Sequence, residues 1–176
     1  MSEGKRLPLD KAKALADKIV AVLAPACDRL EIAGSIRRRQ QFVGDVEIVA
    51  IPKREGLLED TVQLDRLLRG LVASGKLHLI KNGDKYKQFA ILKAGINLDL
   101  FLCEPETWGV CLTIRTGPAT FSKRMVTQQF MGGNLPNDLR VHELRVWRGD
   151  TALETPGEGD FFKIAEAVYV PPEERR

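Results

Sequence analysis

Residues 33–51 read AGSIRRRQQFVGDVEIVAI and combine strand, turn and charge patterns within nineteen residues. Its second half, Asp45–Ile51, alternates along the chain and is rich in β-branched residues, which predicts a strand. The short apolar run Leu30–Ala33 predicts a further strand, which Gly34-Ser35 breaks before a brief basic turn. The chain from Leu30 to Ile51 is therefore expected to form two strands, with a short basic turn after the first.

The remaining elements follow from apolar periodicity and turn sequences. Helices are predicted over residues 9–24, 57–72, 106–116, 119–131 and 160–167. Strands are predicted over residues 76–80, 86–92 and 96–102, and the strands 140–147 and 151–153 flank Gly149-Asp150 as a hairpin. Helices segregated from a mostly antiparallel sheet define an α+β fold. The composition changes near Cys103–Glu106, which predicts a first domain over residues 1–105 and a mainly helical second domain with a β-hairpin over residues 106–176.

Charge and composition restrict the class of protein. The net charge is +3, and residues 1–100 carry 18 basic against 13 acidic side chains. A polyanion is therefore expected to prefer the first domain, although an ordinary solvated surface explains the same excess. No apolar run reaches the ~18 residues of a membrane span. The polar start and three widely spaced cysteines favour a cytoplasmic protein without disulfides.

Three acidic residues form the sharpest candidate site. Asp45 and Glu47 are two apart on one strand, so their side chains project from the same face. Asp99 interrupts the apolar strand NLDLFL, where a carboxylate is costly unless it is paired or binds a cation. Carboxylates without histidine suit Mg²⁺, and three of them can hold two ions about 3.5–4 Å apart. The plainer alternatives are a solvated acidic edge and a structural ion pair of Asp99 with Arg37 or Lys87.

Phosphate-binding groups are predicted ten residues upstream. Gly34 permits close approach of the backbone, and Ser35 offers a hydroxyl group. Arg38 can bind a phosphate with two parallel hydrogen bonds. A plain turn with surface charge is the alternative. Together with the acids, these groups match what nucleotidyl transfer from a triphosphate requires.

The chain resembles the DNA polymerase X family, the DNA polymerase beta-like nucleotidyltransferases. Residues 33–51 are similar to the family's nucleotidyltransferase signature, and LDLFL with Asp99 is similar to the strand of its third acid. TWGVCLTIRTGPATFSKRM, residues 107–125, looks like the family's nucleotide-selecting segment. The ending EGDFFKIAEAVYVPPEERR is similar to its C-terminal helix and Pro-Pro-Glu tail. The resemblance runs from about Arg6 to Arg176.

The resemblance implies a catalytic centre. Asp45 and Glu47 would bind or bridge two Mg²⁺ ions, for which Mn²⁺ can substitute. Asp99 would bind the catalytic metal and take the proton from the primer's 3′ hydroxyl group. The second acid is Glu47 where the family usually has aspartate, which alters the spacing available to the metals.

The resemblance also implies contacts to the nucleotide. The residues that match the family's triphosphate-binding segment are Gly34, Ser35 and Arg38. Thr116 and Gly117 match the turn under the sugar, and Ser122 falls where a polar residue often touches the incoming base. A surface residue of a helix is the alternative for Ser122. Ile114 and Arg115 stand where aromatic residues often pack on the sugar, which predicts weaker exclusion of ribonucleotides.

The resemblance thus implies a nucleotidyltransferase palm and a nucleotide-selecting lobe, without the family's N-terminal module. The expected activity is that of a minimal, monomeric DNA polymerase that adds dNTPs to a DNA primer and fills short gaps in repair. A nucleotidyltransferase acting on RNA, protein or a small molecule is the first alternative. A catalytically silent nucleotide- or DNA-binding module is the second.

Overall fold

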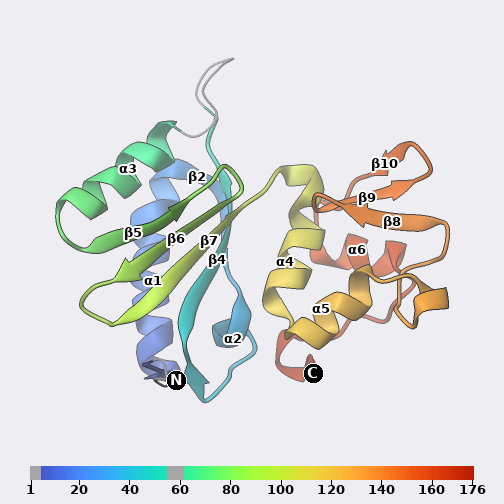
Figure 1. The fold of residues 1–176 in the computed structure, drawn as a ribbon, viewed down its shortest axis with the longest axis horizontal. Helices are drawn as coiled ribbons and strands as arrows, with labels where there is room; N and C mark the ends of the chain where they lie inside the picture. The colour runs from blue at the N-terminus through green and yellow to red at the C-terminus, as the bar shows by residue number, and fades with distance from the viewer. Residues whose placement is uncertain (1–4, 55–61) are drawn as a thin grey trace. The chain divides into compact units, whose positions relative to one another are not determined.

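The computed structural model describes residues 5–54 and 62–176 of the chain. It divides into two compact units, of which the first ends at Leu102 and the second runs from Cys103 to Arg176. Helices and a mixed sheet give the α+β fold that the sequence predicted (Figure 1). The division between the units lies close to the predicted boundary after residue 105.

The first unit is built on a five-stranded sheet. Its strands, in spatial order, are β2 (Cys27–Ile32), β4 (Asp45–Pro52), β7 (Ile96–Leu102), β6 (Tyr86–Ile91) and β5 (Leu77–Asn82). The central pair β4–β7 is parallel, and the other pairs are antiparallel. The helices α1 (Leu9–Leu23) and α3 (Val62–Ala73) pack against this sheet. Their apolar residues form one buried cluster with alternate residues of the strands. The predicted strand 96–102 is confirmed in full.

Shorter elements complete the first unit. The short helix α2 (Gly34–Arg37) follows β2, and a 3-10 turn, η1 (Ala24–Ala26), follows α1. β1 (Leu7–Pro8) pairs with β3 (Phe42–Val43), a two-residue ladder that is too short to leave a pattern in the sequence. Residues 57–61 of the helix predicted over 57–72 lie outside the described residues.

The second unit has its own core. The helices α4 (Trp108–Thr116), α5 (Ala119–Val126) and α6 (Glu158–Ile164) pack with the sheet β8 (Leu139–His142), β9 (Arg145–Arg148) and β10 (Thr151–Leu153). Three 3-10 turns, η2 (Pro105–Thr107), η3 (Gln129–Met131) and η4 (Pro172–Glu174), connect or end these elements.

Two predictions in the second unit were wrong. The strand predicted over 140–147 is two strands, because Glu143 and Leu144 turn the chain with φ values of 51° and 67°. The predicted hairpin is therefore a three-stranded antiparallel sheet. The helix predicted over 119–131 ends at Val126, since Thr127 leaves helical geometry and Gln128 bridges to Leu135.

In the described part of the chain, none of the helices combines the length and the apolar character needed to span a membrane.

The C-terminal tail is anchored in the second unit by Arg175. This side chain is buried, donates to Glu158 Oε1 at 2.8 Å and to the Val170 carbonyl at 3.0 Å. Its guanidinium carbon lies 5.2, 5.4 and 5.8 Å from the ring centroids of Phe121, Phe162 and Tyr169. One cation thus ties the end of the chain to α5 and α6.

Arg175→Ala is expected to destabilise the second unit by about 3–5 kcal/mol, because it leaves the buried Glu158 carboxylate without its cation. Urea denaturation followed by tryptophan fluorescence measures this, since Trp108 and Trp147 both belong to that unit. Arg176→Ala removes the exposed neighbour and serves as the control, with an expected change within about 0.5 kcal/mol. Equal losses in the two variants would contradict the anchoring role.

Candidate active site

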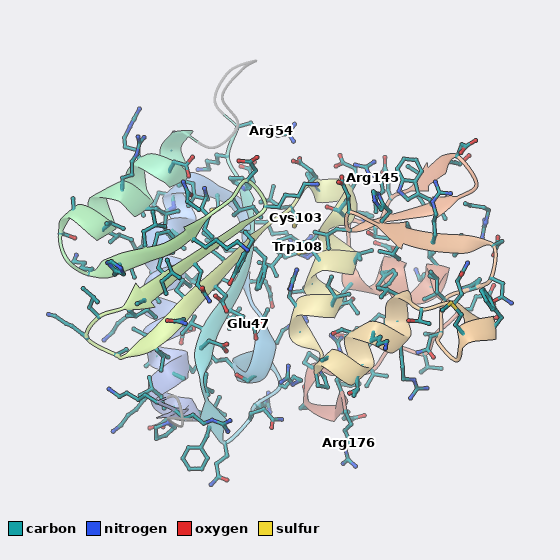
Figure 2. The ribbon with its side chains drawn as sticks, viewed as in Figure 1. Glu47, Arg54, Cys103, Trp108, Arg145 and Arg176 are labelled. Atoms are coloured by element: carbon teal, nitrogen blue, oxygen red, sulfur yellow. The ribbon has the colours of Figure 1, made fainter. Side chains whose placement is uncertain are left out.

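The three predicted acids lie on the two central strands. Asp45 and Glu47 belong to β4 and Asp99 to β7, and the parallel register sets Glu47 beside Asp99 and Asp45 beside Asn97. Paired residues of neighbouring strands project from the same face of a sheet. The residues between them enter the core shared with α1 and α3, namely Val46, Ile48, Leu98 and Leu100. The acids therefore share the opposite face of the sheet, where Figure 2 labels Glu47.

Asp99 has a hydrogen-bond partner that the sequence analysis missed. The Tyr86 hydroxyl donates to Asp99 Oδ1 at 2.9 Å from β6, the antiparallel neighbour of β7. The signal for Tyr86 was present in the turn sequence Ala94-Gly95, because the register of a hairpin closed there brings residue 86 near residue 99. Tyr86 thus positions one oxygen of the carboxylate.

Arg37 and Lys87, the two cations considered as ion-pair partners of Asp99, are recorded beside other residues. Lys87 lies on β6 beside Tyr86 and therefore points to the opposite face. There its ammonium group lies 3.1 Å from Asp65 Oδ1 and 2.7 Å from Asn82 Oδ1. Arg37 lies 3.7 Å from Glu31 Oε1.

Glu47 lies against the start of α2. Gly34 has a φ of 59°, and a Cβ atom built there would overlap the Glu47 carboxylate. The Ala33 N–H donates to the Glu47 carbonyl at 2.8 Å, which fixes the entry of α2 beside β4. Only glycine allows this approach. Gly34, which was predicted to bind phosphate, is therefore also needed to make room for the Glu47 side chain.

Ser35 and Arg38 belong to the same local structure. The Ser35 hydroxyl is buried and makes no hydrogen bond with any described residue. Leaving a buried polar group without a hydrogen-bond partner costs stability. Such a group is typical of a position that binds a ligand. Arg38 follows α2, and its charge acts on Asp45 as described next.

The pKa of Asp45 is raised above its ordinary value. Burial is the largest cause, since it disfavours the charged form, and the nearby Asp99 carboxylate adds to it. The Arg38 guanidinium opposes the shift. Two carboxylates and one arginine therefore interact electrostatically on this face, and a bound cation would relieve the repulsion between the acids.

The donor set suits a hard cation, but its members are not gathered as a closed cluster. Among residues 5–54 and 62–176, no group of three or more histidine, cysteine, aspartate or glutamate side chains is arranged to hold a metal ion. Glu47 lies against Gly34, and Tyr86 donates to Asp99. Carboxylate oxygens are the ligands that Mg²⁺ prefers, so the chemistry fits and the magnesium site stays a prediction.

The other predicted nucleotide contacts lie together in the second unit. Thr116 ends α4 and is buried, and the Gly117 N–H donates to the Thr113 carbonyl at 3.1 Å. The Ser122 hydroxyl donates to the Ile114 carbonyl at 2.7 Å, which braces the corner between α4 and α5. A Cβ atom at Gly117 would lie 2.6 Å from the Phe121 ring, so glycine is needed for this corner. The proposed contacts of these residues to sugar and base stay predictions.

Comparison with known proteins adds no relative: no protein-family model matches the chain, and no curated protein does.

Gly34→Ala is expected to lower the free energy of unfolding by at least ~1–2 kcal/mol, because alanine is strained at a positive φ and its Cβ displaces Glu47. Gly44→Ala is the matched control, since nothing lies within 4 Å of a Cβ atom there. Urea denaturation of both variants tests this. A loss in Gly44→Ala as large as that in Gly34→Ala would contradict the close approach.

Asp45→Asn is expected to stabilise the protein at neutral pH. Because folding raises the pKa of Asp45, its contribution to stability is complete below the unfolded pKa of about 3.9 and is lost as the pH rises through the folded-state pKa. The advantage of the asparagine variant should therefore appear towards pH 7 and vanish near pH 3. Urea denaturation across this range, with chelator present, measures it. A wild-type protein more stable than Asp45→Asn at pH 7 would refute the repulsion.

Proposed function

We propose that this chain is a metal-dependent nucleotidyltransferase of the DNA polymerase X type, which adds dNTPs to the 3′ hydroxyl group of a DNA primer. The observation that carries the proposal is the register of β4 and β7, which sets the carboxylates of Asp45, Glu47 and Asp99 on one face of the sheet. Short-gap filling in DNA repair is the proposed use of this activity. The resemblance of residues 33–51 and 107–125 to the family supports it further.

The local chemistry supports transfer from a triphosphate. Arg38 acts on Asp45, so a bound triphosphate within reach of Arg38 would lie beside the acids. The buried, unpartnered Ser35 hydroxyl offers one more donor to a phosphate oxygen. Gly34 keeps the backbone of α2 close to Glu47. Donors to phosphate and acceptors for a cation are thus adjacent.

The proposed reaction is an in-line displacement. The primer's 3′ oxygen attacks the α-phosphorus of the dNTP, the bond to the β-phosphate oxygen breaks, and pyrophosphate leaves. Asp99 would take the hydroxyl proton while Tyr86 holds its other oxygen in place. Asp45, Glu47 and Asp99 are the residues that would hold Mg²⁺, which neutralises the phosphates when bound. Positioning and charge neutralisation would supply most of the catalysis.

Primer extension tests the proposal. The purified chain is given each dNTP on nicked, one-nucleotide-gapped and template-free DNA, and on an RNA primer, with Mg²⁺ or Mn²⁺. Metal-dependent extension of the DNA primers is expected. Extension of the RNA primer alone would favour the alternative acceptor, and no turnover of any dNTP or NTP would favour a silent binding module.

Asp99→Asn is expected to lower the rate of incorporation by about 10³-fold or more, because losing one charged ligand removes roughly 4 kcal/mol of charge stabilisation. Asparagine keeps an oxygen for the Tyr86 hydroxyl, so the fold should survive. Single-turnover extension measures the rate, and Asp84→Asn, an exposed loop residue, is the control. Near wild-type turnover by folded Asp99→Asn would refute the site.

Arg38→Ala is expected to raise the Michaelis constant for dNTP roughly 10- to 100-fold with little change in DNA affinity, since one charge-assisted contact contributes about 1.5–3 kcal/mol. The matched control is Arg37→Ala, because Arg37 lies beside Glu31. Steady-state extension and DNA binding are measured side by side. Weakened DNA binding with an unchanged dNTP dependence would assign Arg38 to DNA.

A further inference from the structure

The far edge of the first unit's sheet is formed by β5. In the described part of the chain, β5 pairs with β6 on one side and with no strand on the other. Figure 1 shows it as the outermost strand beside α3. An edge strand presents N–H and C=O groups that can pair with an added strand. β5 therefore has unused capacity for backbone hydrogen bonds.

An apolar cavity of about 350 Å³ lies between β5 and α3. Leu68 and Val72 line it from α3, and Leu79 and Phe89 line it from β5 and β6. Leu79 pairs with Phe89 across the two strands, so both side chains project towards the helix. A strand added beside β5 would project alternate side chains on this same face, next to the cavity.

Apolar residues on β5 remain exposed in the folded chain. Leu79 retains 42% and Ile80 retains 50% of their accessible surface, at the point where the ladder with β6 shifts register. Exposed apolar residues beside a cavity and an unpaired edge are typical of a peptide-binding surface.

The charged residues along β5 indicate which kind of strand can pair with it. Residues 76–85, KLHLIKNGDK, carry three lysines and one aspartate. The cavity is lined by Arg69 and by Asp65, and Asp65 is paired with Lys87. A second copy of β5 laid antiparallel would bring these like charges together, which opposes a dimer through this edge. An acidic strand would be attracted instead.

We infer that β5 and the adjacent cavity form a docking site for an extended peptide of a partner protein, in which acidic residues alternate with apolar ones. The peptide adds a sixth strand to the sheet by pairing with β5. One of its apolar side chains enters the cavity beside Leu79. Its acidic side chains project from the opposite face of the sheet, on which Lys81 pairs with Gln88 and lies over the Tyr86 ring. The cavity lies on the face of the sheet opposite Asp45 and Asp99, and the inference does not depend on the proposed activity.

Binding is tested with the full chain and a fluorescein-labelled ten-residue peptide in which glutamate alternates with valine and leucine. Saturable fluorescence anisotropy with a dissociation constant of about 10–100 μM is expected. The same peptide with lysine in place of glutamate, or with proline at its centre, should bind at least about tenfold more weakly. Hydrogen exchange should slow at the amides of Leu77–Asn82 when the glutamate peptide is bound.

Two variants locate the site. Lys81→Glu changes an exposed residue on β5 and should weaken binding at least about fivefold, while Lys18→Glu on α1 makes the same charge change elsewhere and should stay within about twofold. Leu79→Lys should abolish binding, with circular dichroism to check the fold. No saturable binding, equal loss in the two charge variants, or unchanged exchange at β5 would overturn the inference. Full displacement of the peptide by duplex DNA would also overturn it and assign the surface to nucleic acid, and sedimentation of the free chain as a β5-dependent dimer would assign it to a second copy.

Discussion

The parallel pairing of β4 with β7 is the constraint on which the first unit depends. This ladder joins two strands that are far apart in the sequence, and it sets Glu47 beside Asp99. The alternate residues of both strands fill the core under α1 and α3. A slip of one residue would turn Asp99 into that core and the apolar residues outward, so burial of the core and placement of the acids are enforced by the same register.

The acidic face shows how a site is held together at a cost to stability. Burial and the Asp99 carboxylate raise the pKa of Asp45, so the charged form is disfavoured in the folded chain. The Arg38 guanidinium opposes this rise in the pKa of Asp45, and Tyr86 holds the Asp99 carboxylate by a hydrogen bond. Carboxylates held this close together are typical of sites where a bound cation or substrate offsets their repulsion, which is consistent with the proposed chemistry.

The second unit reaches its fold by different means. A single buried arginine, Arg175, joins the tail to α5 and α6 through Glu158 and three aromatic rings. The corner of Gly117 and Ser122 is closed by the hydroxyl bond to Ile114. These contacts are made by single side chains to a carboxylate, to rings or to the backbone, and they leave little periodic signal in the sequence.

The sequence by itself determined the elements that carry strong periodicity, including the strands at Asp45–Ile51 and 96–102, and it singled out the three acids because carboxylates interrupt apolar strands there. It could not determine the turn at Glu143-Leu144 or the end of α5, since neither carries the usual turn residues and both are set by backbone pairing of the flanking segments. Three features could be seen only in the tertiary structure: the hydrogen bond from Tyr86 to Asp99, the contact of Glu47 with Gly34, and the unpaired edge of β5 among the described residues. The reason is that these contacts depend on strand order and register, which arise when a common core forms from residues that are far apart in the chain.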